Sequence, residues 1–293
     1  MILGEVITAM VTPFNKKGEL DIDKASELAN YLAKNGSEGL VLAGTTGESP
    51  TLTYEEEISL FKEIKNAVGK KVKIIAGTGS NSTVTAIKST QAAEKIGVDA
   101  CLIVAPYYNK PPQAAVYKHY MEIAKNTSLP IIIYNIPGRT GINISAEILV
   151  KLSQQKNIMG LKDSTGNLEQ LSWVKKNAEK SFLIYSGDDV LTLPILAVGG
   201  DGVISVASHL IGKEIKKMIT DFKKGKVKSA LDIHLKYLPL FKVLFITSNP
   251  IPVKAALKLS RIDCGEVRLP LISANKNETQ KIKEVLKQYG LIK

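Results

Sequence analysis

The sequence contains only two cysteines in 293 residues, Cys101 and Cys264. Two cysteines cannot build the disulfide framework of a small secreted domain, so we expect reduced thiols, with Cys101 buried as a small apolar residue in its apolar run. The sequence also has no run of about 18 apolar residues, the minimum for a membrane-spanning helix. Its N-terminus lacks the basic region and apolar core of a secretory signal. We therefore expect a cytoplasmic protein.

Arginine is scarce as well. Of 39 basic residues, only Arg139, Arg261 and Arg268 are arginine, although the formal net charge is +11. Bidentate recognition of bases and phosphates favours arginine, and no basic patch interleaved with aromatic residues is present. The lysines are spread over predicted helix surfaces. We therefore expect neither a nucleic acid nor a membrane as a partner.

The composition is otherwise that of a folded protein with a large core. Hydrophobic residues make up 44% and charged residues 23% of the chain, which excludes wholesale disorder. Short apolar runs typical of buried parallel strands alternate with longer stretches of helical periodicity. The predicted strands are residues 6–11, 39–43, 72–76, 100–104, 130–134, 158–162, 182–185 and 202–206. The predicted helices are residues 25–34, 55–67, 84–95, 114–125, 146–152, 168–177, 190–197 and 213–222.

Eight strand–helix units predict an α/β fold of the (β/α)8 (TIM) barrel type. We assign the barrel to residues 1–225 and a helical C-terminal region to residues 226–293. An open doubly wound sheet is the alternative. It usually carries a glycine fingerprint after the first strand, where this chain has Thr12-Pro13-Phe14-Asn15.

Active sites of such barrels lie at the carboxyl ends of the strands. Lys162 ends the sixth predicted strand, above an apolar core, where desolvation favours a neutral, nucleophilic amine. Tyr134 ends the neighbouring fifth strand and could move protons beside it. By position alone, Lys162 also fits an ordinary lysine that reaches solvent, and Tyr134 fits an aromatic residue that covers the core.

Two further strand ends carry candidate anion-binding groups. Thr45 and Thr46 follow the second strand and could hold a small carboxylate, although simple turn chemistry explains them too. Arg139, in a Pro-Gly-Arg-Thr-Gly loop, is suited to a second carboxylate. The three histidines have no metal-ligand spacing, and we interpret Asp188-Asp189 as a helix N-cap.

Six motifs in order resemble the dihydrodipicolinate synthase family of pyruvate-dependent class I aldolases, over essentially the whole chain. They are Gly44-Thr45-Thr46-Gly47-Glu48, Tyr107-Tyr108-Asn109-Lys110-Pro111, Tyr134-Asn135-Ile136-Pro137-Gly138-Arg139-Thr140-Gly141, Gly160-Leu161-Lys162-Asp163, Gly187-Asp188-Asp189 and Asn249-Pro250-Ile251-Pro252-Val253-Lys254.

The resemblance implies a condensation of pyruvate with L-aspartate 4-semialdehyde in the diaminopimelate and lysine pathway. Lys162 would form the Schiff base, with a proton relay of Tyr134, Thr45 and Tyr108, the last from a neighbouring subunit of a homo-oligomer, most simply a dimer of dimers. The implied substrate-binding residues are Thr46 for the pyruvate carboxylate, Arg139 for the aldehyde's carboxylate, and Gly187 and Ile204 lining the imine pocket. No metal or organic cofactor is expected.

Related functions stay open at this stage. N-acetylneuraminate lyase and 2-keto-3-deoxy sugar acid aldolases share the barrel, the lysine and the tyrosine, but lack the arginine at Arg139. Asp163 after the lysine resembles the sugar aldolases, because many synthases carry glutamate there. A non-catalytic barrel that senses metabolites is a third possibility, although sensing pyruvate would need no nucleophile.

The resemblance also bears on regulation. Many family members are inhibited by lysine, and Ser49, Asn81 and Tyr107 match the residues that bind it. The binding glutamate is replaced by Thr85, and the histidine pair by Tyr54 and Glu57. We therefore expect weak inhibition by lysine.

Overall fold

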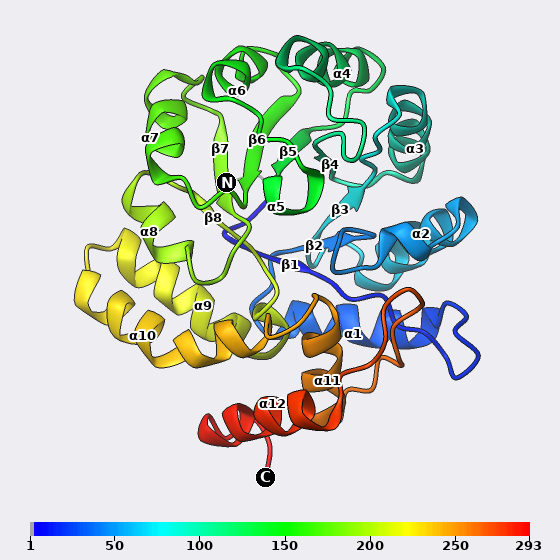
Figure 1. The fold of residues 1–293 in the computed structure, drawn as a ribbon, viewed down its shortest axis with the longest axis vertical. Coiled ribbons are helices and arrows are strands. Elements are labelled where there is room, and N and C mark those ends of the chain that lie inside the picture. The colour runs from blue at the N-terminus through cyan, green and yellow to red at the C-terminus, as the bar shows by residue number, and fades with distance from the viewer. Residues whose placement is uncertain (1–2) are drawn as a thin grey trace. The chain divides into compact units, whose positions relative to one another are not determined.

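The computed structural model describes residues 3–293 and contains eight parallel strands that pair in chain order as a closed barrel (Figure 1). The predicted (β/α)8 fold is confirmed. No helix in the described residues is both long and apolar enough to span a membrane. The strands are β1 (Val6–Ala9), β2 (Gly39–Leu42), β3 (Lys73–Gly77), β4 (Ala100–Val104), β5 (Ile131–Asn135), β6 (Ile158–Asp163), β7 (Leu183–Ser186) and β8 (Gly202–Ser205).

Helices follow each strand at or near the predicted positions. They are α1 (Ile22–Lys34), α2 (Tyr54–Val68), α3 (Thr83–Ile96), α4 (Gln113–Lys125), α6 (Ala146–Ser153), α7 (Leu168–Asn177), α8 (Thr192–Ala197) and α9 (Ser208–Lys223). The C-terminal region is helical, as predicted, with α10 (Val227–Val243), α11 (Ile251–Leu259) and α12 (Lys276–Gln288).

Two short elements were not predicted: a 3-10 turn, η1 (Ser49–Thr51), and a single helical turn, α5 (Pro137–Thr140), where a loop was expected. Neither is long enough to give a periodic pattern in the sequence. The assignment of Asp188-Asp189 as a helix N-cap was wrong, because Leu191 precedes α8 and makes no side-chain capping bond. The Asp188 carboxylate instead accepts a hydrogen bond from Val190 N at 2.9 Å, which closes a tight turn before the helix.

The strands form because their residues are apolar on both faces. All five residues of β5 are buried, as are the four of β1, β2 and β8. Such runs suit a parallel sheet covered by helices. Cys101 is fully buried in β4, as expected, and burial raises the pKa of its thiol to about 12.

Local signals set where the helices begin. At α2, the Thr53 side chain accepts a hydrogen bond from Glu56 N, and the Glu56 carboxylate accepts one from Thr53 N. The same reciprocal capping box joins Asn275 and Glu278 at α12. Each box satisfies two of the backbone donors that a helix leaves unpaired at its start.

The described chain divides into two compact units. One comprises residues 3–73 and 205–293, and the other residues 74–204. In the first unit β1 pairs with β2, α1 packs on α2, and α12 packs on α10 and α11. In the second, the register runs unbroken from β3 to β7 apart from one irregularity between Ile131 and Ile132. The boundary expected at residues 225 and 226 stays a prediction.

Candidate active site

Lys162 and Tyr134 lie side by side on neighbouring strands of the second unit. The register of β5 and β6 pairs the two residues, so their side chains leave the same face of the sheet. The Lys162 Nζ lies 4.1 Å from the centroid of the Tyr134 ring, and both side chains are buried. The amine thus sits against a phenol in a largely dry environment, the arrangement that the two strand ends predicted.

Gly187 lies directly after β7, against the stem of Lys162. Its backbone N–H donates to Asp163 O at 2.7 Å, which draws the two strand ends together. A Cβ at this position would lie 2.1 Å from Ser164 Oγ and 3.0 Å from both Asp163 O and Lys162 Cε. Glycine is therefore the residue that allows the lysine stem to pass at this distance.

Asp163 is fully buried immediately after Lys162. Its Oδ1 accepts hydrogen bonds from Thr165 N at 3.0 Å and Thr165 Oγ1 at 2.7 Å, whereas its Oδ2 has no hydrogen-bond partner among the described residues. Burial raises the pKa of this carboxyl, against the lowering effect of the Thr165 bonds. These contacts shape the turn that follows the lysine.

Arg139 is presented by the single helical turn α5. Thr140 Oγ1 donates to Ile136 O at 3.0 Å, and the turn ends at Gly141, whose φ of 75° is left-handed. Arg139 itself is exposed. Arg139 therefore stands on a helical turn, not on the open loop that the sequence suggested.

Tyr108 lies on the loop between β4 and α4 and is 89% exposed. Its φ of 71° is left-handed, a strained conformation for a residue with a side chain. The loop is tied to the preceding β3–α3 loop, because Asn81 Nδ2 donates to Tyr107 O at 3.2 Å and Asn109 Nδ2 donates to Asn81 O at 2.9 Å. Tyr108 is therefore held outward on a fixed loop.

Thr45 and Thr46 belong to the first unit, in the loop after β2. Thr46 is buried and its Oγ1 accepts a hydrogen bond from Asn249 Nδ2 at 2.9 Å, while Thr45 is half-buried. Thr12 Oγ1 donates to Gly47 O at 2.6 Å and fixes the same loop from the end of the first strand. Of the remaining predicted residues, Ile204 is buried within β8.

The geometry can be compared with known proteins. The family model described as "Dihydrodipicolinate synthetase family" matches residues 2–289. The chain belongs to the dihydrodipicolinate synthetase family. It is thus an enzyme of that family, and the resemblance drawn from the six motifs is confirmed.

Relatives of this family member are similar over their whole length. The chain is 51% identical over 289 residues to the 4-hydroxy-tetrahydrodipicolinate synthase of Moorella thermoacetica and 52% identical over 290 residues to that of Nostoc punctiforme, covering 99% of each chain in both cases. A crystal structure of the enzyme from Cyanidioschyzon merolae with lysine bound superposes with a TM-score of 0.98 at 48% identity, again with 99% of both chains covered.

One buried contact near the threonines was not expected from the sequence. The carboxylate of Glu48 is paired with Lys254 on α11, at 2.6 Å between Oε1 and Nζ. Both residues stand in motifs that carry the family resemblance, but their pairing was not expected. The available signal was Lys254 itself, the one charged residue in the apolar stretch from Ile251 to Leu257.

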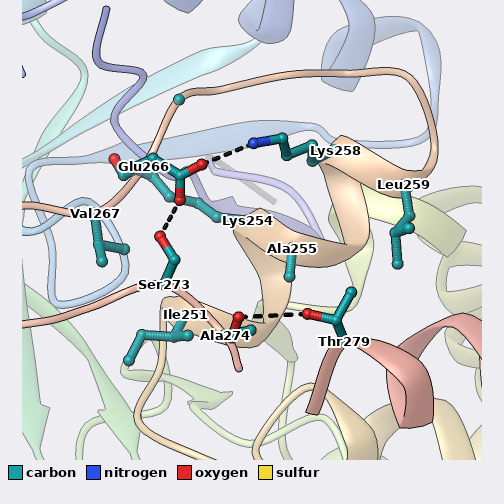
Figure 2. Close-up of a pocket in the computed structure, with 11 residues that line it drawn as sticks. Ile251, Lys254, Ala255, Lys258, Leu259, Glu266, Val267, Ser273, Ala274 and Thr279 are labelled. Atoms are coloured by element: carbon teal, nitrogen blue, oxygen red, sulfur yellow. Dashed lines mark hydrogen bonds and ion pairs between the residues drawn. The ribbon is translucent and has the colours of Figure 1, made fainter. Parts of the chain in front are cut away.

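The first unit also contains a cavity of about 310 Å³ beside α11, which Figure 2 shows. Lys254 and Lys258 lie on its α11 side, and Glu266 contacts both Lys258 and Ser273 at its rim (Figure 2). None of the site residues predicted from the sequence lines this cavity.

Proposed function

We propose that this family member is a 4-hydroxy-tetrahydrodipicolinate synthase that condenses pyruvate with L-aspartate 4-semialdehyde for diaminopimelate and lysine synthesis in the cytoplasm. The observation that carries the proposal is the buried amine of Lys162 beside the Tyr134 phenol, in a chain about half identical to synthases of that name.

The first half of the reaction makes a nucleophile from pyruvate. The Lys162 amine attacks the keto carbon, and the carbinolamine loses water to give an imine. Loss of a methyl proton then gives the enamine. Tyr134, Thr45 and Tyr108 carry these protons, while Thr46 binds the pyruvate carboxylate. The 4.1 Å between Lys162 Nζ and the Tyr134 ring supports the first of these roles.

The second half uses the enamine. Its methylene carbon attacks the aldehyde carbon of L-aspartate 4-semialdehyde, forming the new carbon–carbon bond, and the aldehyde oxygen takes up a proton. The substrate's amino group then displaces Lys162 from the imine carbon and closes the ring. Arg139 binds the carboxylate of this second substrate, for which its exposed position on a rigid turn is suited.

Gly187 and Ile204 shape the imine pocket. Gly187 leaves room for the lysine stem, since even a methyl group there would lie 3.0 Å from Lys162 Cε. Ile204 is a buried apolar residue and would line the same pocket. Neither residue needs a functional group for this role.

We propose that the working enzyme is a homo-oligomer, most simply a dimer of dimers. Tyr108 is 89% exposed and strained, although it is assigned to a proton relay. A strained and outward-held tyrosine is expected where a neighbouring subunit uses it.

The test is covalent trapping. Incubation with pyruvate and borohydride should inactivate the enzyme and leave one reduced pyruvyl group on Lys162, identified by peptide mass spectrometry. Lys162→Arg keeps the charge without a neutral amine and should lose nearly all turnover. An adduct on a different lysine, or none, would contradict the assignment.

Substrate choice is tested separately. Steady-state assays should show turnover of pyruvate with aspartate semialdehyde and not with N-acetylmannosamine. The reverse preference would identify an N-acetylneuraminate lyase instead, and the absence of turnover with either would favour the non-catalytic barrel.

A further inference from the structure

The loop with the two threonines, residues 44–48, is held from the C-terminal region. We call it the threonine loop. Asn249 Nδ2 donates to Thr46 Oγ1 at 2.9 Å, Lys254 Nζ lies 2.6 Å from Glu48 Oε1, and Arg268 N donates to Glu48 Oε2 at 3.0 Å. Three residues from one segment thus contact two side chains of one short loop, all within the first unit.

The ion pair in this set is buried. The side chain of Lys254 is 4% exposed and that of Glu48 is 1% exposed. Taking two charges out of water is costly, and an apolar pair of the same volume is often more stable. Burial lowers the pKa of Lys254, against the opposing effect of Glu48. The pair is thus poorly explained as a source of stability alone.

The neighbours of Lys254 fix its direction. Its ammonium also donates to Glu266 O at 3.0 Å and lies 4.3 Å from the centroid of the Phe14 ring. The Arg268 guanidinium lies 4.2 Å from the same ring and is bonded to the Glu56 carboxylate at 2.5 and 2.7 Å. The lysine therefore has one orientation, and that orientation sets where the Glu48 carboxylate must be.

Glu48 connects the contacts from the C-terminal region to the backbone of the threonine loop. Its φ of 57° is left-handed, a conformation that a residue with a Cβ keeps only where the surroundings determine it. Glu48 N also donates to Thr45 O at 3.2 Å, which joins the carboxylate's position to the turn that presents Thr45.

We propose that Lys254 is a positioning residue, which holds Thr45 and Thr46 in their catalytic places through Glu48. The inference rests on the proposed function, in which these threonines serve the proton relay and the pyruvate carboxylate. On this view the helical C-terminal region holds the threonine loop in place.

The chain offers a matched control on the same helix. Lys258 lies one turn after Lys254, and its ammonium pairs with Glu266 Oε1 at 2.7 Å at the rim of the cavity (Figure 2). Its side chain is 54% exposed. Lys258→Met removes the same charge from α11 without touching the threonine loop.

The experiment compares steady-state kinetics of Lys254→Met and Lys258→Met with the wild-type enzyme. For Lys254→Met we expect kcat/KM for pyruvate to fall about 100-fold, as a displacement of about 1 Å can cause. The KM for aspartate semialdehyde should change less than about threefold, because Arg139 is untouched. Lys258→Met should match the wild type in both constants.

A second variant separates positioning from folding, because an unpaired buried Glu48 could unfold the protein. Glu48→Gln/Lys254→Met removes both charges, so its thermal stability should recover toward that of the wild type. Its KM for pyruvate should stay raised, because no ion pair holds the loop. The inference would be overturned if the KM for pyruvate recovered together with the stability. It would also be overturned if the KM values for both substrates rose equally.

The same assays of the wild-type enzyme distinguish the proposed function from the positioning role of Lys254. A wild type without pyruvate-dependent turnover or a Lys162 adduct would overturn the proposed function itself. An active wild type with an unchanged Lys254→Met would overturn the positioning role alone.

Discussion

Gly187 leaves no room for a methyl group beside Lys162. A Cβ on Gly187 would lie 3.0 Å from Lys162 Cε and 3.0 Å from Asp163 O, as well as 2.1 Å from Ser164 Oγ. The hydroxyl can rotate away and the end of the lysine side chain can shift, whereas Asp163 O belongs to the backbone of β6. An added methyl group would therefore displace the Lys162 amine.

This displacement predicts that Gly187→Ala slows imine formation more than it destabilises the fold. We expect the rate of borohydride trapping with pyruvate to fall about 10- to 100-fold, because the amine moves by a fraction of an ångström or more. Adding Ser164→Ala removes the closest clash but not the other two. Full recovery in this double variant would mean that the serine alone is responsible.

Arg139 is expected to act on one substrate. Arg139→Ala should raise the KM for aspartate semialdehyde at least about 30-fold, from the loss of a charged pair that is typically worth about 2–5 kcal/mol. The KM for pyruvate should be nearly unchanged. Arg139→Lys keeps the charge but loses the bidentate geometry, so its KM for aspartate semialdehyde should lie between those of the wild type and Arg139→Ala. An equal rise in KM for both substrates would indicate that Arg139 holds the turn together instead.

The shared site can be tested by mixing inactive subunits. Tyr108→Phe chains combined with Lys162→Ala chains should regain some activity, because one site in each hybrid then has both groups intact. The control mixes Tyr134→Phe with Lys162→Ala. Those two lesions fall in the site of a single chain, as the register of β5 and β6 requires, so no hybrid site is whole. A verified hybrid without recovery in the first mixture would refute the shared tyrosine.

Inhibition by lysine is expected to be weak. The resemblance implies that Thr85 replaces the glutamate of lysine-sensitive relatives, and an unpaired charge at an interface costs about 2–5 kcal/mol, or roughly 30-fold or more in affinity. Titration of the activity with lysine checks this. Strong, saturable inhibition at sub-millimolar lysine would contradict the prediction, and Glu57→Ala would then show whether Glu57 serves as the substitute partner.

Glu57 predicts a pH dependence of stability. Burial raises the pKa of its carboxyl from 4.5 to about 7, although Ser49 Oγ donates to it at 2.7 Å. The unfolded chain therefore releases this proton at a lower pH than the folded one. The contribution of Glu57 to the free energy of unfolding is therefore fully present below about pH 4.5 and is lost as the pH rises to about 7. The loss amounts to at most about 3 kcal/mol.

Urea unfolding of Glu57→Gln at several pH values checks the sign of this pH dependence of stability. The variant should be more stable than the wild type at pH 8, and the difference should vanish near pH 4.5. Glu55→Gln, on the exposed side of α2, should show no such difference. A Glu57→Gln variant that is less stable than the wild type at pH 8 would contradict the predicted loss of stability at high pH.

Much of the fold was predictable because its signals are local. Runs such as Pro130–Tyr134 and Ile158–Lys162 are too apolar and too short for anything but buried strands, and their order places Lys162 beside Tyr134. The boundaries moved by only a residue, so that Asn135 and Asp163 end β5 and β6.

The contacts that hold the threonine loop were not predictable in this way. No periodicity links Glu48 to Lys254, since the pair depends on how the first strands and the C-terminal helices pack together. The helical turn at Arg139 also escaped, because four residues cannot show a helical repeat. Sequence patterns report burial and local geometry, whereas these features arise from distant partners and from short turns.

The contacts of the threonine loop also order events during synthesis of the protein. Thr46 and Asn249 are 203 residues apart in the chain, and Glu48 and Arg268 are 220 apart. At about 5–20 residues per second, roughly 10–40 s pass on the ribosome between the two partners. The last barrel strand, β8, ends at Ser205, so all eight strands are synthesised before the partners that hold the threonine loop. If the proposed positioning role holds, a chain that ends before Asn249 lacks every one of these contacts and should have little activity.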